Sequence, residues 1–144
     1  MRIAVAATPE VAIPSLDALL SSKHELLSVI TQPDRPSGRG RSLTESSVSR
    51  WAKENGIEVN KPEKDATFQP FLSNADLLIT IGYGVILPKE VFESPRYGSL
   101  NLHFSLLPRW RGAAPVQRAI EAGDLVSGVT VFAIDEGMDT GPIY

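Results

Sequence analysis

The sequence predicts an α/β protein with a mostly parallel central sheet and helices on both faces. A strand-like run over 2–6, a helix-like segment over 12–21 and a second strand-like run over 26–31 follow one another. Parallel pairing and a right-handed crossover are the default for such a unit. The run 76–81 is continuously apolar, as expected of a strand covered on both faces. At 144 residues the chain can bury one core as a single domain.

The remaining elements follow from apolar periodicity and from residues that start or stop helices. Ser46 or Ser47 can cap a helix that runs to about residue 55, and Gly56 can end it. A helix over 66–72 is expected to be broken or kinked near Pro70. Further strands are predicted at 57–59, 99–103 and 127–134, and further helices at 88–92 and 114–122.

Segment 32–42 contains prolines and glycines and has no periodic apolar face, so we expect an exposed, mobile loop. It gathers Arg35, Arg39 and Arg41, and a second group, Arg109, Arg111 and Arg118, follows the strand at 99–103. The net charge of the chain is −3. An acidic protein with local arginine clusters suits one particular anionic partner rather than indiscriminate binding of nucleic acid.

Several classes of site are disfavoured by what the sequence lacks. With no cysteine there is no thiol nucleophile or thiolate metal site, and two histidines are too few for a histidine-based zinc site, so we expect no metal. There is no G-x-G-x-x-G after the first strand and no P-loop. No apolar run is long enough to span a membrane, and the N-terminal run stops before the length of a signal peptide, so we expect a cytoplasmic protein.

Asn101 and His103 form the strongest candidate site. They lie two residues apart, on one face of a predicted strand, near the end where α/β proteins bind ligands. The acidic loop with Asp135, Glu136 and Asp139 follows the next strand, and adjacent strand ends should bring it beside the histidine. An amide can donate to a developing oxyanion, an imidazole can move a proton, and a carboxylate can set the imidazole's tautomer and charge. This set suits acyl or one-carbon transfer.

Other residues are less informative. His24, in a polar stretch, is predicted to lie on the surface. Tyr83, between two glycines at the end of the apolar strand, could equally line a pocket or pack in the core. Ser105 lacks the flanking glycines of a nucleophile elbow.

Longer motifs resemble the folate-dependent formyltransferase family. Asn101-x-His103 is followed by Ser-Leu-Leu-Pro at 105–108 and, further on, by Asp139. The blocks LPRWRGAAPVQR at 107–118 and TQPDRPSGRGR at 31–41 resemble in particular the branch of the family that acts on methionyl-tRNA. The resemblance covers essentially the whole chain.

This resemblance implies a Rossmann-like formyltransferase fold and transfer of a formyl group from 10-formyltetrahydrofolate to the amino group of initiator methionyl-tRNA. It implies that Asn101, His103 and Asp139 are the catalytic residues. The implied folate contacts are Ser105, Leu106, Leu107, Pro108, Tyr83, Gly84, Val85, Ile86, Leu87 and Asp135. The implied tRNA contacts are Arg35, Arg39, Arg41, Arg109 and Arg111.

The sequence departs from the family pattern at Ala7, where glycine is usual, and at Phe104, where a small residue is usual. Family members of this branch continue with the rest of the domain and a β-barrel that helps hold tRNA. We therefore expect 1–144 to be the N-terminal portion of a catalytic domain, truncated inside the sheet, and the full-length protein to be a monomer. The alternatives are a formyltransferase for a small amine, such as glycinamide ribonucleotide or an amino-sugar nucleotide, and an inactive folate- or RNA-binding fragment.

Overall fold

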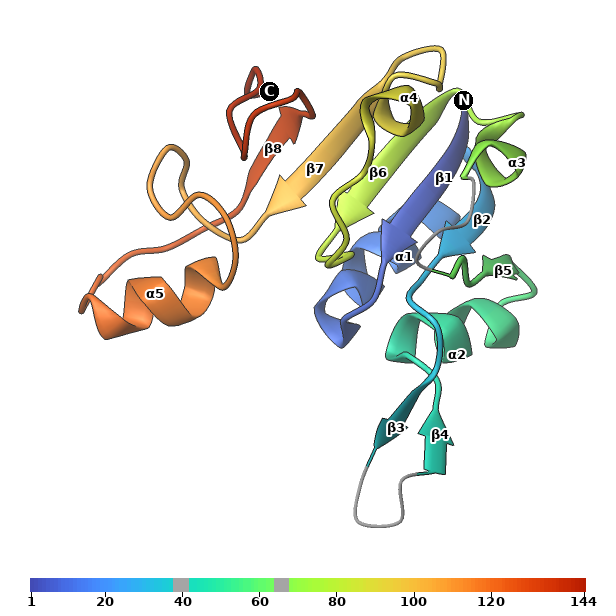
Figure 1. The fold of residues 1–144 in the computed structure, drawn as a ribbon, viewed down its shortest axis with the longest axis horizontal. Helices are drawn as coiled ribbons and strands as arrows, with labels where there is room; N and C mark the ends of the chain where they lie inside the picture. Colours follow the sequence, from blue (N-terminus) through green and yellow to red (C-terminus); the bar gives the residue numbers. More distant parts are fainter. Residues whose placement is uncertain (38–41, 64–67) are drawn as a thin grey trace.

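The computed structural model describes residues 1–37, 42–63 and 68–144 and centres on a six-stranded sheet (Figure 1). The strands lie in the order β5-β2-β1-β6-β7-β8, and a separate two-stranded sheet pairs β3 with β4. The strands are β1 (Arg2–Ala7), β2 (Glu25–Ile30), β3 (Arg35–Ser37), β4 (Ser42–Thr44), β5 (Glu58–Asn60), β6 (Leu77–Ile81), β7 (Ser99–His103) and β8 (Thr130–Ala133). The helices are η1 (Glu10–Ala12), α1 (Ile13–Leu20), α2 (Ser47–Glu54), α3 (Gln69–Leu72), α4 (Lys89–Phe92) and α5 (Pro115–Glu121).

The main sheet is parallel except at one edge. β1 pairs in parallel with β2 and β6, β2 with β5, and β6 with β7, whereas β8 runs antiparallel to β7. The predicted mostly parallel sheet is therefore confirmed. The antiparallel direction of β8 was not foreseen. It matters for the site because it determines whether the loop after β8 begins near the His103 end of β7 or near the opposite end.

Both faces of the sheet are covered, as predicted. Alternate residues of β1 point to opposite faces: Ile3 and Val5 pack in one cluster with residues of α1 and α2, whereas Ala4 and Ala6 pack in another with residues of α3 and α4. α5 extends away from the body of the sheet, and Ala119 is its buried residue (Figure 1).

The residues at the beginning of α2 and α3 suit the start of a helix. Ser46 caps α2, as predicted, because its hydroxyl accepts a hydrogen bond from the Ser49 N–H over 3.0 Å. Pro70 lies in the first turn of α3, where a residue needs no intrahelical N–H bond. The predicted start of that helix, at residue 66, lies outside the described residues. None of the described helices is long and apolar enough to cross a membrane.

The segment predicted as a mobile loop over 32–42 contains β3 and the first residue of β4, so the prediction of a loop was wrong for these residues. β3 and β4 pair antiparallel, with Pro36 opposite Leu43, and project away from the main sheet (Figure 1). Leu43 is 73% exposed, so this ribbon has no buried face to produce an apolar pattern in the sequence. Arg39 and Arg41 lie outside the described residues.

Candidate active site

The amide of Asn101 is oriented by a neighbouring strand. Asn101 on β7 is paired with Thr80 on β6, and the Thr80 hydroxyl donates to Asn101 Oδ1 over 2.8 Å. The amide oxygen is thereby engaged, and the NH₂ group is left as the donor. Sequence reasoning missed Thr80, although a threonine within the apolar strand Leu77–Ile81 was the available signal.

The His103 imidazole is buried, with 7% of the residue exposed, and an oxygen atom faces each ring nitrogen. Nε2 lies 2.8 Å from the Trp110 carbonyl oxygen, and because a carbonyl can only accept, Nε2 carries the proton. Nδ1 lies 3.5 Å from Asp139 Oδ2, which is an ion pair when the ring is doubly protonated. The Phe132 ring packs edge-on against the imidazole, with centroids 6.5 Å apart.

Asp139 reaches His103 as predicted, but not by the predicted route. Thr130 at the start of β8 lies opposite His103, and Ala133 at its end lies opposite Leu100. The acidic loop therefore leaves β8 at the end of the sheet opposite to His103. The expectation that adjacent strand ends bring the loop to the histidine was wrong, because it assumed a parallel β8.

The loop instead folds back toward His103. After it, the Pro142 carbonyl accepts from the Ala133 N–H over 2.9 Å, which closes the reversal against β8. Asp135 orders the interior of the loop by accepting from the Gly137 N–H at 3.0 Å and from the Thr140 hydroxyl at 2.8 Å. Asp139 has φ of 53°, and its Oδ2 accepts from the Gly112 N–H over 2.7 Å. The carboxylate thus joins this loop to the turn after β7.

The turn after β7 is held in place by hydrogen bonds from β8 and by a hydrogen bond within the turn itself. Ser105 is fully buried and its hydroxyl donates to the Arg109 carbonyl over 2.6 Å. The Thr130 hydroxyl donates to the Ser105 carbonyl over 2.7 Å and accepts from the Leu107 N–H over 3.1 Å. The peptide bond between Leu107 and Pro108 is cis. The Ser105 side chain therefore builds the turn, while Leu106 is exposed.

The turn after β6 carries the other predicted folate contacts. Tyr83 is buried against Phe68, with ring centroids 6.3 Å apart, and this burial raises the pKa of its phenol. The side-chain amide of Gln32 donates to the Tyr83 carbonyl over 2.7 Å. Of the two roles left open for Tyr83, the structure shows core packing. Val85 is exposed and Ile86 is 87% exposed.

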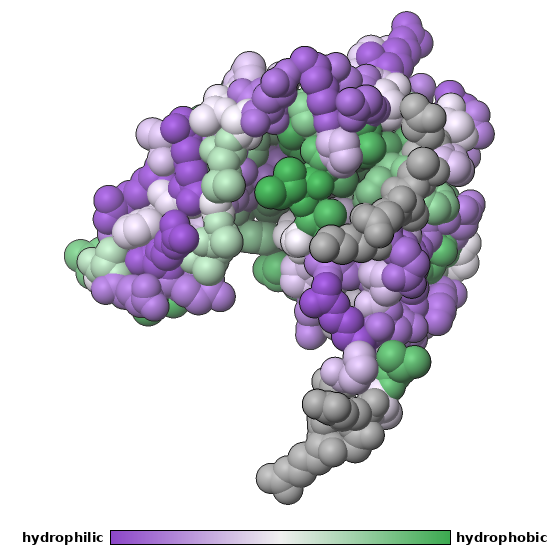
Figure 2. All heavy atoms as spheres, in the orientation of Figure 1, coloured by the Kyte–Doolittle hydropathy of each residue, from purple (hydrophilic) through white to green (hydrophobic). Residues whose placement is uncertain are grey.

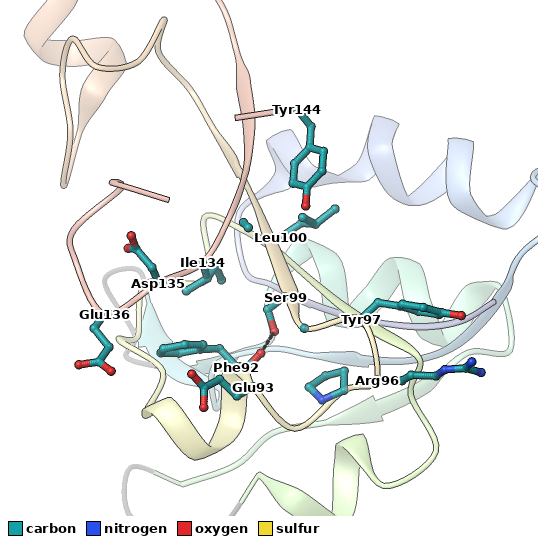
Figure 3. A pocket seen from close by; sticks show the side chains of 13 residues that line it. Phe92, Glu93, Arg96, Tyr97, Ser99, Leu100, Ile134, Asp135, Glu136 and Tyr144 are labelled. Carbon is teal, nitrogen blue, oxygen red and sulfur yellow. Dashed lines mark hydrogen bonds between the residues drawn. The ribbon is translucent and has the colours of Figure 1, made fainter. Parts of the chain in front are cut away.

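On the face shown in Figure 2 the molecule is hollowed, with apolar surface in the hollow and polar surface above it. A separate cavity of about 380 Å³ lies where β7 begins and β8 ends (Figure 3). It is lined in part by Ser99, Leu100, Ile134 and Tyr144, and neither Asn101 nor His103 borders it. Within residues 1–37, 42–63 and 68–144, no cluster of three acidic or histidine side chains could hold a metal ion.

The predicted arginines have different surroundings. Arg35 donates to the Gln32 side-chain oxygen at the base of the β3/β4 ribbon. Arg109 is paired with Asp124 at 2.7 Å, and its guanidinium lies over the Trp110 ring. Arg111 is exposed. Sequence reasoning missed Asp124, because nothing in the sequence pairs it with Arg109 fifteen positions earlier.

Comparison with known proteins shows the family of the chain. Residues 1–144 match the family described as "Formyl transferase". The chain is 54% identical to the methionyl-tRNA formyltransferase of Chromohalobacter salexigens, with 98% of this chain and 45% of the relative covered. It is 53% identical to that of Thermobifida fusca, with 100% and 48% covered. The chain thus spans about half the length of these relatives.

Solved structures show the same fold. Phosphoribosylglycinamide formyltransferase from Bacillus halodurans superposes with a TM-score of 0.75 at 26% identity, covering 99% of this chain and 76% of that one. WlaRD, a sugar 3N-formyl transferase solved with dTDP and 5-N-formyl-THF, superposes with a TM-score of 0.67 at 26% identity, covering 99% and 49%.

Proposed function

This chain belongs to the formyl transferase family, and from that premise we propose that it carries the catalytic site of an enzyme that formylates methionyl-tRNA. The formyl donor is 10-formyltetrahydrofolate, and the product is N-formylmethionyl-tRNA for the initiation of translation. The observation that carries the proposal is the pairing of His103 with Asp139, whose carboxylate lies 3.5 Å from the imidazole Nδ1, with Asn101 two residues earlier on the same strand. The resemblance to methionyl-tRNA formyltransferases at about half identity favours this acceptor over a small amine.

In the proposed reaction the free amino group of the methionyl residue attacks the formyl carbon. The new N–C bond pushes an electron pair onto the formyl oxygen, and the Asn101 NH₂ group donates to that oxyanion. The hydrogen bond from Thr80 to Asn101 Oδ1 supports this role, because it leaves the NH₂ end of the amide as the available donor. The C–N bond to folate then breaks and the formyl carbonyl re-forms.

His103 transfers the proton in this scheme. The attacking amine must lose a proton, and the departing folate nitrogen must gain one, directly through His103 or by way of a water. Since Nε2 is occupied by its hydrogen bond to the Trp110 carbonyl, Nδ1 is the nitrogen that exchanges the proton with the substrates. Asp139 balances the charge of the doubly protonated ring.

The folate site is proposed at the turns that follow β6 and β7. The exposed apolar side chains of Val85, Ile86 and Leu106 suit contact with a flat ring system. Backbone groups of Tyr83, Gly84, Leu87, Leu107, Pro108 and the loop with Asp135 are proposed to recognise the pterin. A direct contact from Ser105 remains a prediction, since its hydroxyl is already bonded within the turn.

The tRNA is proposed to bind along two arginine groups. Arg35, Arg39 and Arg41 belong to the segment that includes the projecting β3/β4 ribbon, and Arg109 and Arg111 belong to the turn after β7. Contacts of this kind with phosphates make affinity fall with salt. The protein is proposed to act in the cytoplasm, as a monomer at full length.

The test is formylation by the full chain with three acceptors offered in turn: methionyl-tRNA, glycinamide ribonucleotide and an amino-sugar nucleotide. We expect rapid formylation of methionyl-tRNA alone. Comparable rates with a small amine would support the alternative, and folate binding with no transfer to any acceptor would refute the proposal. In the variant Arg39→Ala, we expect weaker tRNA binding and a salt dependence reduced by about one phosphate contact; an unchanged salt dependence would remove Arg39 from the tRNA site.

A further inference from the structure

Asp124 ties the segment after α5 to the turn after β7. Its Oδ2 accepts from Arg109 Nε at 2.8 Å and its Oδ1 from Arg109 Nη2 at 2.7 Å. Oδ2 also accepts from Trp110 Nε1 at 2.7 Å. The Arg109 guanidinium lies 4.4 Å from the centre of the Trp110 ring, so the carboxylate, the cation and the indole form one unit. We call these three residues the Asp124 cluster.

The cluster holds a backbone conformation that a tryptophan rarely adopts. Trp110 has φ of 61°, in the left-handed region, where bulky side chains are disfavoured. Such a conformation persists only when surrounding contacts determine it. Ser105 fixes the backbone next to it, at the Arg109 carbonyl. Asp124 fixes the indole itself, through the bond to Trp110 Nε1.

The consequence of this conformation is the direction of the Trp110 carbonyl. It points at the His103 ring, 2.8 Å from Nε2. In a neutral imidazole only one nitrogen carries a proton, and the partner of one nitrogen decides which. The Trp110 carbonyl lies 2.8 Å from Nε2, whereas the Asp139 carboxylate lies 3.5 Å from Nδ1, so the nearer acceptor holds the proton of the neutral ring at Nε2 and the Nδ1 lone pair faces Asp139.

We propose that Asp124 is a positioning residue, which holds Trp110 in the conformation whose carbonyl selects the Nε2-protonated tautomer of His103. Its importance for catalysis rests on the proposed formyl transfer, but its effect on the imidazole does not. Asp124 touches no reacting group. It acts through the Trp110 indole and backbone, and the Arg109 guanidinium offsets its charge. The bond from Arg109, followed by that from Trp110, lowers the pKa of Asp124 to about 2, so the cluster is intact at neutral pH.

The test uses two conservative variants and a matched control. Asp124→Asn keeps the size of the side chain but loses the charge that holds Arg109, and Trp110→Phe keeps an aromatic ring but loses the indole donor. The control is Asp76→Asn, because Asp76 also contacts an arginine but lies before β6, at the other end of the sheet. It accepts a hydrogen bond from the Arg2 backbone N–H at 2.7 Å and forms an ion pair with Arg2 Nη2 at 3.5 Å. Each of the three variants removes a side-chain contact that supports a turn or strand end, but only Asp124→Asn and Trp110→Phe act on Trp110.

The primary measurement is the ¹⁵N spectrum of the histidine rings of the full chain. With two histidines in the sequence, His24→Gln assigns the signals of His103. We expect neutral His103 in the wild type and in Asp76→Asn to be protonated at Nε2. In Asp124→Asn and in Trp110→Phe we expect a substantial Nδ1-protonated population and a kcat for formyl transfer lowered by about tenfold to a hundredfold.

The outcomes distinguish a positioning role of Asp124 from an effect on stability alone. A loss of kcat in Asp124→Asn with an unchanged tautomer would show that Asp124 acts only on stability, and would overturn the proposal. The same applies if Asp76→Asn changes the tautomer equally. If the wild type transfers no formyl group, the proposed function fails, but the tautomer measurement still decides the role of Asp124.

Discussion

Replacing Thr80 by valine tests whether the orientation of the Asn101 amide matters for transfer. Valine has the shape of threonine without the hydroxyl, so Thr80→Val removes the 2.8 Å hydrogen bond to Asn101 Oδ1 and a longer one, at 3.4 Å, to the Leu100 carbonyl. A hydrogen bond of this kind is worth about 1 kcal/mol net. An energy of that size favours the productive amide orientation by about five to one, and its loss lets both orientations be populated about equally.

The expected result is a fall in kcat of a little under twofold, roughly 1.7-fold, because the correctly oriented fraction of the amide falls from about five-sixths to about one-half and the misoriented amide presents oxygen to the oxyanion. The matched control is Thr80→Ser, which keeps the hydroxyl and loses a buried methyl group, at a cost of about 1 kcal/mol of stability. Both variants should therefore lower the melting temperature by a few degrees, about 2–4 °C. Only the valine variant should lose kcat.

Single-turnover transfer of labelled formyl groups, with both substrates saturating, measures this effect without interference from product release. An Asn101→Ala background adds a second control, because Thr80→Val should have no further effect on kcat once the amide is absent. Equal losses of kcat in the valine and serine variants, or a loss in Thr80→Val that persists in the Asn101→Ala background, would refute the reasoning.

Three further predictions concern the supports of the site. The pKa of Asp124 is lowered from 3.8 to about 2, chiefly by the bond from Arg109, so the ion pair stabilises the fold fully above pH 3.8 and this contribution is lost as the pH falls through about 2. Urea unfolding between pH 6 and pH 2 should therefore show a steeper acid loss of stability in the wild type than in Asp124→Asn. Gly84→Ala should destabilise the fold by more than about 1 kcal/mol and weaken folate binding, since φ is +79° and the added Cβ would lie 2.6 Å from Gln32 Nε2; calorimetry with folate would contradict this if affinity and melting temperature were unchanged. Ser46→Ala should lower the free energy of unfolding by about 1 kcal/mol through loss of the α2 cap, with kcat for transfer unaffected.

Much of the sheet could be predicted because its signals are local. The apolar run around β6 and the order of elements at the start of the chain indicate parallel strands buried on both faces, and the alternating residues of β1 do pack in two separate clusters. Asn101 and His103 were recognisable for the same reason, since two residues on a strand share a face whatever surrounds them. β7 itself begins and ends where the sequence predicts.

The rest depends on contacts between distant segments. The direction of β8 is set by pairing that its own residues do not encode, so the path of the loop to Asp139 could not be derived, although its destination could. The hydrogen bond between the Trp110 carbonyl and His103 involves a backbone atom and a residue with a left-handed backbone conformation. Neither feature can be predicted from the types of the residues involved. The β3/β4 ribbon lacks a buried face, so apolar periodicity could not reveal it.

The central claim is that the imidazole of His103 moves the proton during formyl transfer. The most direct measurement is the single-turnover rate of transfer from 10-formyltetrahydrofolate to methionyl-tRNA by the full chain and by His103→Ala, with folate binding and folding checked for both. The account predicts a rate at least about a hundredfold lower in the variant, with folate still bound. Full activity in a folded His103→Ala protein would contradict it.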